Sequence, residues 1–186
     1  TVVLKPASDS PWIASKFVEL MEEVWLPPGV LNFVAGGGGD LGEALVTDPR
    51  TRLIAFTGSK PVGLHIQEFA AKPHPKCHWI KRTVLEMGGK DAILVDEDYD
   101  LDEAATSIVQ SAFGFQGQKC SACSRAIIHR KVYDALAGKI VERTKALKVG
   151  DTRAPAMNMG AVINERACND IMGYVGIGKS EGKLLA

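Results

Sequence analysis

The stretch Leu53–Ala71, LIAFTGSKPVGLHIQEFAA, decides the fold class of this chain. Its first residues are apolar, β-branched or aromatic, which is typical of a buried strand. Gly58 and Ser59 then turn the chain, and a helix is predicted from about Val62 to Ala71. A strand that passes through a short glycine turn into a helix is the unit from which parallel α/β sheets are built.

Working outward from this stretch, strands and helices alternate along the rest of the chain. Further strands are predicted at Val2–Lys5, Val30–Val34, the two apolar runs of TVLEMGGKDAILVD (83–96) and Arg125–His129. Further helices are predicted from Asp9 or Ser10 to the LPPG at 26–29, at Leu41–Val46, from Asp100 or Asp102 to Phe113, at Val132–Leu147, and from Asn164 or Glu165 into GKSEG. The alternation predicts parallel βαβ units and an α/β fold.

The composition excludes several classes of function. The chain has 186 residues, of which 46% are hydrophobic, and its formal net charge is zero, so no nucleic-acid or acidic-membrane partner is expected. Its densest basic segment, Lys72–Arg82, is interrupted by prolines and a tryptophan and is interpreted as a solvated loop. Without a run of about 18 apolar residues, no membrane-spanning helix is predicted.

The cysteine count and the first residues suggest the setting of the chain. Four cysteines are too few for a disulfide scaffold, which favours a reducing compartment, the cytoplasm or, in a eukaryote, the mitochondrial matrix. The sequence has no initiator methionine, no signal-peptide pattern, and a predicted strand at its very start. We therefore expect it to be part of a longer polypeptide.

Two glycine motifs are candidate phosphate sites. Gly37, Gly39 and Gly42 satisfy GxGxxG, but four consecutive glycines match many patterns, and no acidic strand end follows about 20 residues later. A flexible turn is the preferred interpretation there. At Gly58-Ser59, a strand leads directly into a helix whose free N–H groups, with the Ser59 hydroxyl, can bind a pyrophosphate. An ordinary capped turn explains that motif equally well.

Glu86 and the cysteines are the candidate catalytic groups. Glu86 ends an apolar run in LEMGG, and the following glycines allow another backbone or a ligand to approach. A buried carboxylate there would suit a general base, although a strand-end glutamate that points to solvent is the commoner case.

The stretch FGFQGQKCSACSR (113–125) contains a CxxC pair. No second ligand pair has zinc-site spacing, and a thioredoxin-type CxxC opens a helix after the first strand, whereas this one precedes a strand. What remains is Cys120 as a nucleophile, in a turn whose N–H groups favour a thiolate and bind an oxyanion. Cys123 and Cys168 are predicted to be buried and inert.

Five stretches, in order, resemble the aldehyde dehydrogenase superfamily: VVLKPAS, FTGSKPVG, LEMGGK, FGFQGQKC and KVGD. The interval of 34 residues between Glu86 and Cys120 also fits the family. The resemblance implies a partial aldehyde dehydrogenase fold: a parallel-sheet, Rossmann-like nucleotide-binding part followed by the start of an α/β catalytic domain. Residues 1–86 would form the C-terminal part of the NAD(P)-binding domain, and residues 87–186 the N-terminal part of the catalytic domain.

The resemblance also implies the catalytic roles. Cys120 would attack the aldehyde carbonyl, and a thioester would form after hydride leaves for the nicotinamide. Glu86 would activate the water that hydrolyses the thioester. The sequence versions KRTVLEMGGKDAILVD and FGFQGQKCSACSR imply L-glutamate γ-semialdehyde as the aldehyde, with Ser121 near its α-carboxylate. No metal is implied.

The cofactor contacts follow by the same resemblance. Lys5 matches the lysine that contacts the adenosine ribose, and Ser59 the residue at the pyrophosphate, while Gly58 and Gly63 shape that turn. NAD-selective relatives often have a glutamate three residues after the lysine. Because Ser8 stands there, the implied cofactor is NAD, with NADP tolerated.

Parts of the family pattern are absent from these residues. The upstream asparagine of the oxyanion hole, the downstream glutamate at the nicotinamide ribose and the oligomerising hairpin have no counterpart, so the chain is expected to be a middle portion. A homo-oligomer is expected at full length. The alternatives are a nucleotide-binding or structural fragment without turnover, a CxxC redox or metal protein, and an acylating relative that transfers the thioester to coenzyme A.

Overall fold

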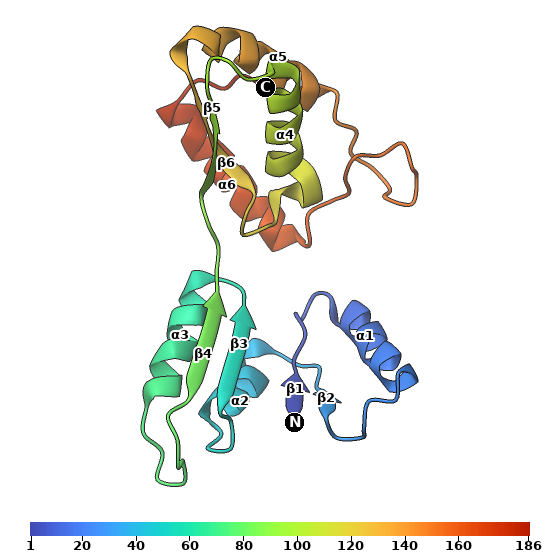
Figure 1. Cartoon of the computed structure of the whole chain (residues 1–186), viewed down its shortest axis with the longest axis vertical. Helices are drawn as coiled ribbons and strands as arrows, with labels where there is room; N and C mark the ends of the chain where they lie inside the picture. The colour runs from blue at the N-terminus through green and yellow to red at the C-terminus, as the bar shows by residue number, and fades with distance from the viewer. The chain divides into compact units, whose positions relative to one another are not determined.

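The computed structural model describes residues 1–186 and confirms the α/β fold, with every strand pair parallel (Figure 1). The chain divides into two compact units, Thr1–Met87 and Gly88–Ala186. This division lies one residue after the boundary expected at Glu86; the nucleotide-binding and catalytic roles of the two units stay predictions. None of the helices is both long and apolar enough to span a membrane.

The first unit contains two separate pairs of parallel strands. Its elements are β1 (Val2–Leu4), α1 (Pro11–Glu23), β2 (Leu31–Phe33), the π-helical turn η1 (Gly38–Gly42), α2 (Glu43–Thr47), β3 (Leu53–Thr57), α3 (Lys60–Ala71) and β4 (Arg82–Glu86). β1 pairs with β2, and β3 with β4 in a register that places Thr57 opposite Glu86. The carboxyl ends of β3 and β4 therefore lie at the same edge.

The glycine run forms a more regular structure than its sequence predicts. Gly38–Gly42 make one π-helical turn that continues directly into α2, so the helical segment begins three residues before the predicted Leu41. Glycine contributes no side-chain pattern, and the periodicity of apolar residues therefore could not reveal this turn. On α2, the Glu43 carboxylate lies 2.7 Å from His65 Nε2 and so connects α2 with α3.

The second unit contains one parallel strand pair and three long helices. Its elements are β5 (Asp91–Val95), α4 (Leu101–Phe113), the short turn η2 (Gly114–Gly117), β6 (Cys123–Ile128), η3 (Arg130–Val132), α5 (Tyr133–Lys145) and α6 (Glu165–Glu181). α4 begins where the sequence predicts because the Asp100 carboxylate accepts from the N–H groups of Asp102 and Glu103, at 2.7 and 3.0 Å.

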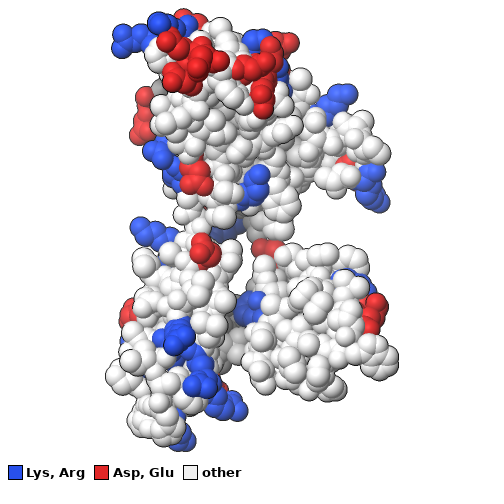
Figure 2. All heavy atoms as spheres, in the orientation of Figure 1, with Lys and Arg blue, Asp and Glu red and all other residues white.

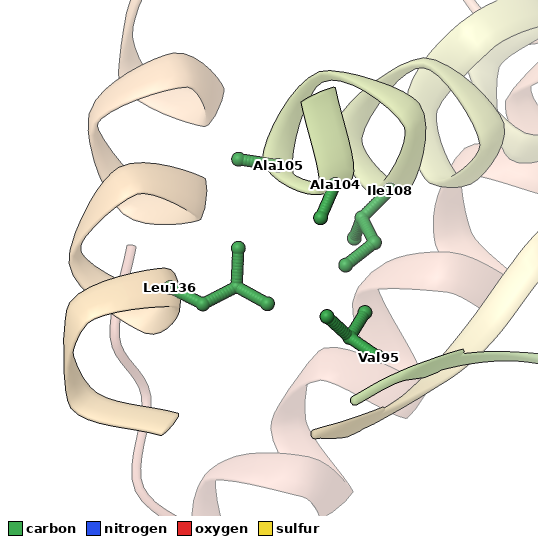
Figure 3. Packing of buried hydrophobic residues seen from close by; sticks show 5 residues of the cluster. All are labelled: Val95, Ala104, Ala105, Ile108 and Leu136. Atoms are coloured by element: carbon green, nitrogen blue, oxygen red, sulfur yellow. The ribbon is translucent and has the colours of Figure 1, made fainter. Parts of the chain in front are cut away.

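A compact apolar cluster joins β5, α4 and α5 of this unit. Figure 3 shows Leu136 of α5 facing Ala104, Ala105 and Ile108 of α4, with Val95 of β5 alongside. Leu136 and Ala105 are fully buried. The two alanines leave room for the helices to approach each other, so the leucine side chain fills the space between them.

Candidate active site

The edge formed by β3 and β4 brings the predicted phosphate turn next to the predicted base. Gly58 N–H donates to the Glu86 carbonyl at 3.0 Å, which continues the ladder one residue beyond the strands. A Cβ at Gly58 would overlap the far end of the Phe56 ring, so a larger residue in this turn would require that ring to move. The Glu86 side chain is exposed, and the buried carboxylate considered from the sequence is not observed in this chain.

The start of α3 packs closely against Met87, the residue that follows β4. Ser59 is the N-cap residue in an extended conformation (φ −74°, ψ 149°), and its hydroxyl makes no capping hydrogen bond. Gly63 is buried, and a Cβ there would lie 2.7 Å from Met87 Sδ. The helix thus packs tightly beside the end of β4 and leaves the Ser59 hydroxyl free, an arrangement that fits a pyrophosphate at its N-terminus.

Lys5 and Ser8 follow β1 in the first unit. The half-buried Lys5 ammonium donates to the Pro6 carbonyl at 2.8 Å. Ser8 is exposed in a turn. Both side chains lie beyond the carboxyl end of a parallel strand, which is the edge where α/β sheets bind ligands.

Cys120 lies in an exposed turn directly before β6. The Ala122 N–H donates to the Lys119 carbonyl at 3.3 Å across this turn. Cys120 is a free, exposed thiol, and Ser121 beside it is exposed as well. A Cβ at Gly89 would lie 2.7 Å from the Cys120 carbonyl oxygen. Gly89 therefore lets the backbone before β5 support the turn that presents the thiol.

The other cysteines have different surroundings. Cys123 is half-buried, packs against the apolar cluster, and donates its N–H to Ser111 Oγ at 3.1 Å. Cys168, which we expected to be buried, is exposed on α6; that prediction was wrong because the apolar face of α6 is not covered in this chain. Cys77 is half-buried and donates to the Trp79 carbonyl.

Sequence reasoning overlooked Met87, and it noted Gly89 without showing which segment Gly89 contacts. Met87 meets Gly63 of α3, and Gly89 meets the backbone of Cys120. Both belong to the LEMGG motif, where the paired glycines were noted as permitting close approach. That motif was the available signal, but it could not show which segment makes the approach.

The basic segment Lys72–Arg82 is a loop that contacts the end of α2 through Lys81. Lys81 Nζ donates to the carbonyls of Val46 and Asp48 at 2.6 and 2.8 Å, at the end of α2. Arg52 stacks on Trp79, with 4.6 Å between the guanidinium carbon and the ring centroid. Figure 2 shows Lys and Arg side chains toward the lower end of this unit. Residues 72–76 are exposed, which agrees with the predicted solvated loop, and Lys81 attaches the end of this loop to the end of α2.

The lowered carboxyl pKa values belong to exposed ion pairs outside the candidate sites. The side chain of Arg50 holds the pKa of Asp48 well below its usual range. Hydrogen bonds from Lys139 and Arg143 lower the pKa of Asp102. Figure 2 shows acidic side chains gathered at the upper end of the second unit. No group of three or more His, Cys, Asp or Glu is placed to hold a metal ion.

Comparisons with known proteins agree with the resemblance. The family model described as "Aldehyde dehydrogenase family" matches residues 1–186. The chain is 58% identical over 185 residues to a 1-pyrroline-5-carboxylate dehydrogenase of Geobacillus kaustophilus, and 56% identical over 186 residues to one of Bacillus subtilis. Each match covers 100% of this chain, which spans 36% of the relative's length.

Solved structures show the same similarity. A Thermus 1-pyrroline-5-carboxylate dehydrogenase with bound NAD superimposes with a TM-score of 0.95 at 44% identity, over 100% of this chain and 36% of that one. Proline utilization A from Bdellovibrio bacteriovorus gives 0.96 at 43% identity, over 100% of this chain and 19% of that one. With a family model that matches its full length, the chain belongs to the aldehyde dehydrogenase family.

Proposed function

We propose that the complete protein oxidises L-glutamate γ-semialdehyde to L-glutamate with NAD, and that this chain supplies the nucleophile and the general base. The observation that carries the proposal is the exposed free thiol of Cys120, in a turn supported by Gly89. The substrate is suggested by relatives 55–58% identical that are named 1-pyrroline-5-carboxylate dehydrogenase.

In the first step, the Cys120 thiolate attacks the aldehyde carbon and forms a thiohemiacetal. The N–H of Cys120 makes no hydrogen bond within the chain, and it can therefore donate to the oxyanion that develops on the former carbonyl oxygen. Ser121 is exposed beside the thiol. Its hydroxyl is our candidate for a contact to the α-carboxylate of the substrate.

In the second step, the thiohemiacetal carbon loses hydride and becomes a thioester on Cys120. NAD, when bound, supplies the acceptor for this hydride. Glu86 then removes a proton from water, and the resulting hydroxide attacks the thioester and releases the carboxylate and the Cys120 thiol. The exposed carboxylate at the end of β4 is accessible to water for this role.

The residues of the first unit fit a dinucleotide. The Ser59 hydroxyl and the start of α3 suit the pyrophosphate, with Gly58 and Gly63 allowing the close backbone packing. The Lys5 ammonium lies beyond β1 and is assigned to the adenosine ribose. Ser8 has no negative charge to repel a 2′-phosphate, and we expect NAD to be preferred and NADP to be tolerated.

Turnover of both cofactors by the complete protein, compared at equal concentration, checks that expectation. We expect a Ser8→Glu variant to lose most NADP turnover and keep NAD turnover, because a carboxylate there would repel the 2′-phosphate. Inertness of NADP at millimolar levels in the unsubstituted protein would remove the idea.

The function itself is tested by NADH formation from glutamate γ-semialdehyde with the complete protein. Cys120→Ala should abolish turnover, while Cys123→Ala should retain most of it, because Cys123 packs against the apolar cluster. Equal loss in both variants would contradict the assignment of the nucleophile. Glu86→Gln should allow one burst of NADH and then stall, because the thioester is no longer hydrolysed.

The same assay separates the alternatives. Turnover that requires coenzyme A would identify an acylating enzyme. Absence of turnover together with retained NAD binding would identify a nucleotide-binding protein. Stoichiometric zinc that disappears in either cysteine variant would identify a metal site instead.

A further inference from the structure

The turn before Cys120 has an unusual backbone. Phe115, Gln116 and Gly117 follow α4 with φ values of 55°, 56° and 68°. Non-glycine residues seldom adopt this left-handed conformation, because the Cβ crowds the backbone. A Cβ at Gly117 would also lie 2.8 Å from the Ala112 carbonyl oxygen. The turn therefore needs contacts elsewhere to hold it.

Burial of the turn's own aromatic side chain does not supply those contacts. Phe115 is 70% exposed. Within the turn, the Gln118 N–H donates to the Phe115 carbonyl at 3.0 Å, a local bond that does not connect the turn with a distant segment.

Two glutamine amides connect the turn to a distant segment. The Ile163 N–H donates to Gln118 Oε1 at 3.2 Å, across 45 residues of sequence. With the Gln116 amide oriented so that its oxygen faces Gly160, that oxygen accepts from the Gly160 N–H at 3.2 Å. Both glutamines are half-buried, and the bond from Ile163 to Gln118 itself is exposed.

The segment Gly160–Ile163 is flanked on both sides by residues that make hydrogen bonds within the unit. On its N-terminal side, Asn158 Oδ1 accepts from the Lys148 N–H at 2.7 Å, and the Asn158 N–H donates to the Lys148 carbonyl at 2.9 Å. On its C-terminal side, Asn164 caps α6 and accepts from the Ala167 N–H at 2.8 Å. A residue that binds this segment is thereby connected with Lys148, which follows α5, and with the start of α6.

We propose that Gln118, assisted by Gln116, is a positioning residue for Cys120. The two amides hold the left-handed turn against Gly160–Ile163 and so fix the turn that presents the thiol two residues later. The inference rests on the proposed function, in which Cys120 is the nucleophile. Gln118 itself acts through the backbone and does not touch the aldehyde.

The test measures how fast iodoacetamide alkylates Cys120 in the complete protein. Peptide mass spectrometry follows Cys120 and Cys168 together, and the exposed Cys168 on α6 serves as an internal reference. Gln118→Met keeps the length of the side chain and removes the acceptor oxygen. Gln110→Met makes the same chemical change at an exposed position on α4 and is the matched control.

We expect the Cys120 rate in Gln118→Met to fall roughly fivefold relative to Cys168, as for the loss of one hydrogen bond. The value of kcat should fall in parallel, while KM for NAD stays unchanged. Gln110→Met should match the unsubstituted protein. An unchanged or raised Cys120 rate in Gln118→Met, or an equal fall in the control, would overturn the proposal.

A second variant removes the other partner of the bond. In Ile163→Pro, the backbone N–H that donates to Gln118 Oε1 is absent. Alkylation of Cys120 in the double variant, Gln118→Met with Ile163→Pro, should be no slower than in either single variant. Additive losses would mean that Gln118 and Ile163 act separately, and this result would overturn the proposal. If Cys120→Ala retained turnover, the proposed function would fail, whereas the alkylation ratio would still decide the role of Gln118.

Discussion

The two units share one pattern of strands and helices, yet they bury it to different extents. In the second unit, Leu136 is fully buried in a cluster that joins β5, α4 and α5. In the first unit, the buried apolar side chains are Val46, Ile66 and Ala70. Its helix α1 has no buried residue, and Trp12 on that helix is 71% exposed.

This difference in burial determines which contacts support the turn of Cys120 and which support the edge that carries Ser59 and Glu86. The turn of Cys120 lies next to an apolar cluster in its own unit. The edge with Ser59 and Glu86 depends mainly on the β3–β4 ladder and on glycines that let α3 pack beside Met87. Core substitutions should therefore cost more stability in the second unit than in the first.

The largest effect is expected from Leu136→Ala. Removing a fully buried leucine leaves a cavity between α4 and α5, and the second unit should lose about 3–4 kcal/mol of unfolding free energy. Ile66→Ala, the corresponding change in the first unit, should cost about 2 kcal/mol, because α3 has fewer buried neighbours. Hydrogen exchange in the complete protein reports each unit separately, and equal losses would contradict the comparison.

Next in size is Gly89→Ala. Its Cβ would lie 2.7 Å from the Cys120 carbonyl oxygen, a backbone atom, so the turn must shift by a few tenths of an ångström. We expect kcat to fall roughly tenfold, since small misplacements of a nucleophile are costly. Gly88→Ala is the matched control, because a Cβ there meets nothing within 4 Å. If both variants were equally active, Gly89 would have no special role.

A smaller effect is expected from Gly63→Ala in the first unit. The new Cβ would meet Met87 Sδ at 2.7 Å, and a flexible methionine can move away. Stability should change little, while the dissociation constant of NAD should rise about threefold, because moving Met87 alters the packing beside the start of α3. Calorimetric titration measures this; unchanged affinity would separate Gly63 from the cofactor site.

The smallest effect is expected from Asp102→Asn. Lys139 and Arg143 of α5 donate to this carboxylate at 2.8 and 2.6 Å and lower its pKa in the folded protein. Because the folded pKa lies below the ordinary 3.8, the ion pair stabilises the protein above that pH and is lost as the pH falls through the lowered value.

The melting temperature of this variant should fall by about a few degrees at most at pH 7, since exposed ion pairs contribute little. The difference from the unsubstituted protein should disappear in acid below the folded pKa. A difference that persisted there would show that the asparagine disturbs the start of α4 instead.

Local signals account for most of what the sequence predicted. The α4 start at Asp100, the Gly58-Ser59 turn into α3 and the strand pair around LEMGG depend on caps, glycines and periodicity within a few residues. The π-helical turn at Gly38–Gly42 was not predicted, because its glycines have no side chains that could form an apolar pattern. The burial of Cys168 was predicted wrongly, because it was expected from the residue type, whereas the helix that carries Cys168 leaves it exposed.

By itself, the sequence determined the α/β fold, the aldehyde dehydrogenase family, and Cys120 and Glu86 as the candidate groups. Only the tertiary structure decided what surrounds them. The Gly89 backbone lies against Cys120, the Gln118 amide binds Ile163, and the Gly58 N–H meets the Glu86 carbonyl. These contacts join residues about 30 to 45 positions apart, where strand register and helix packing set the distance and no local pattern encodes it.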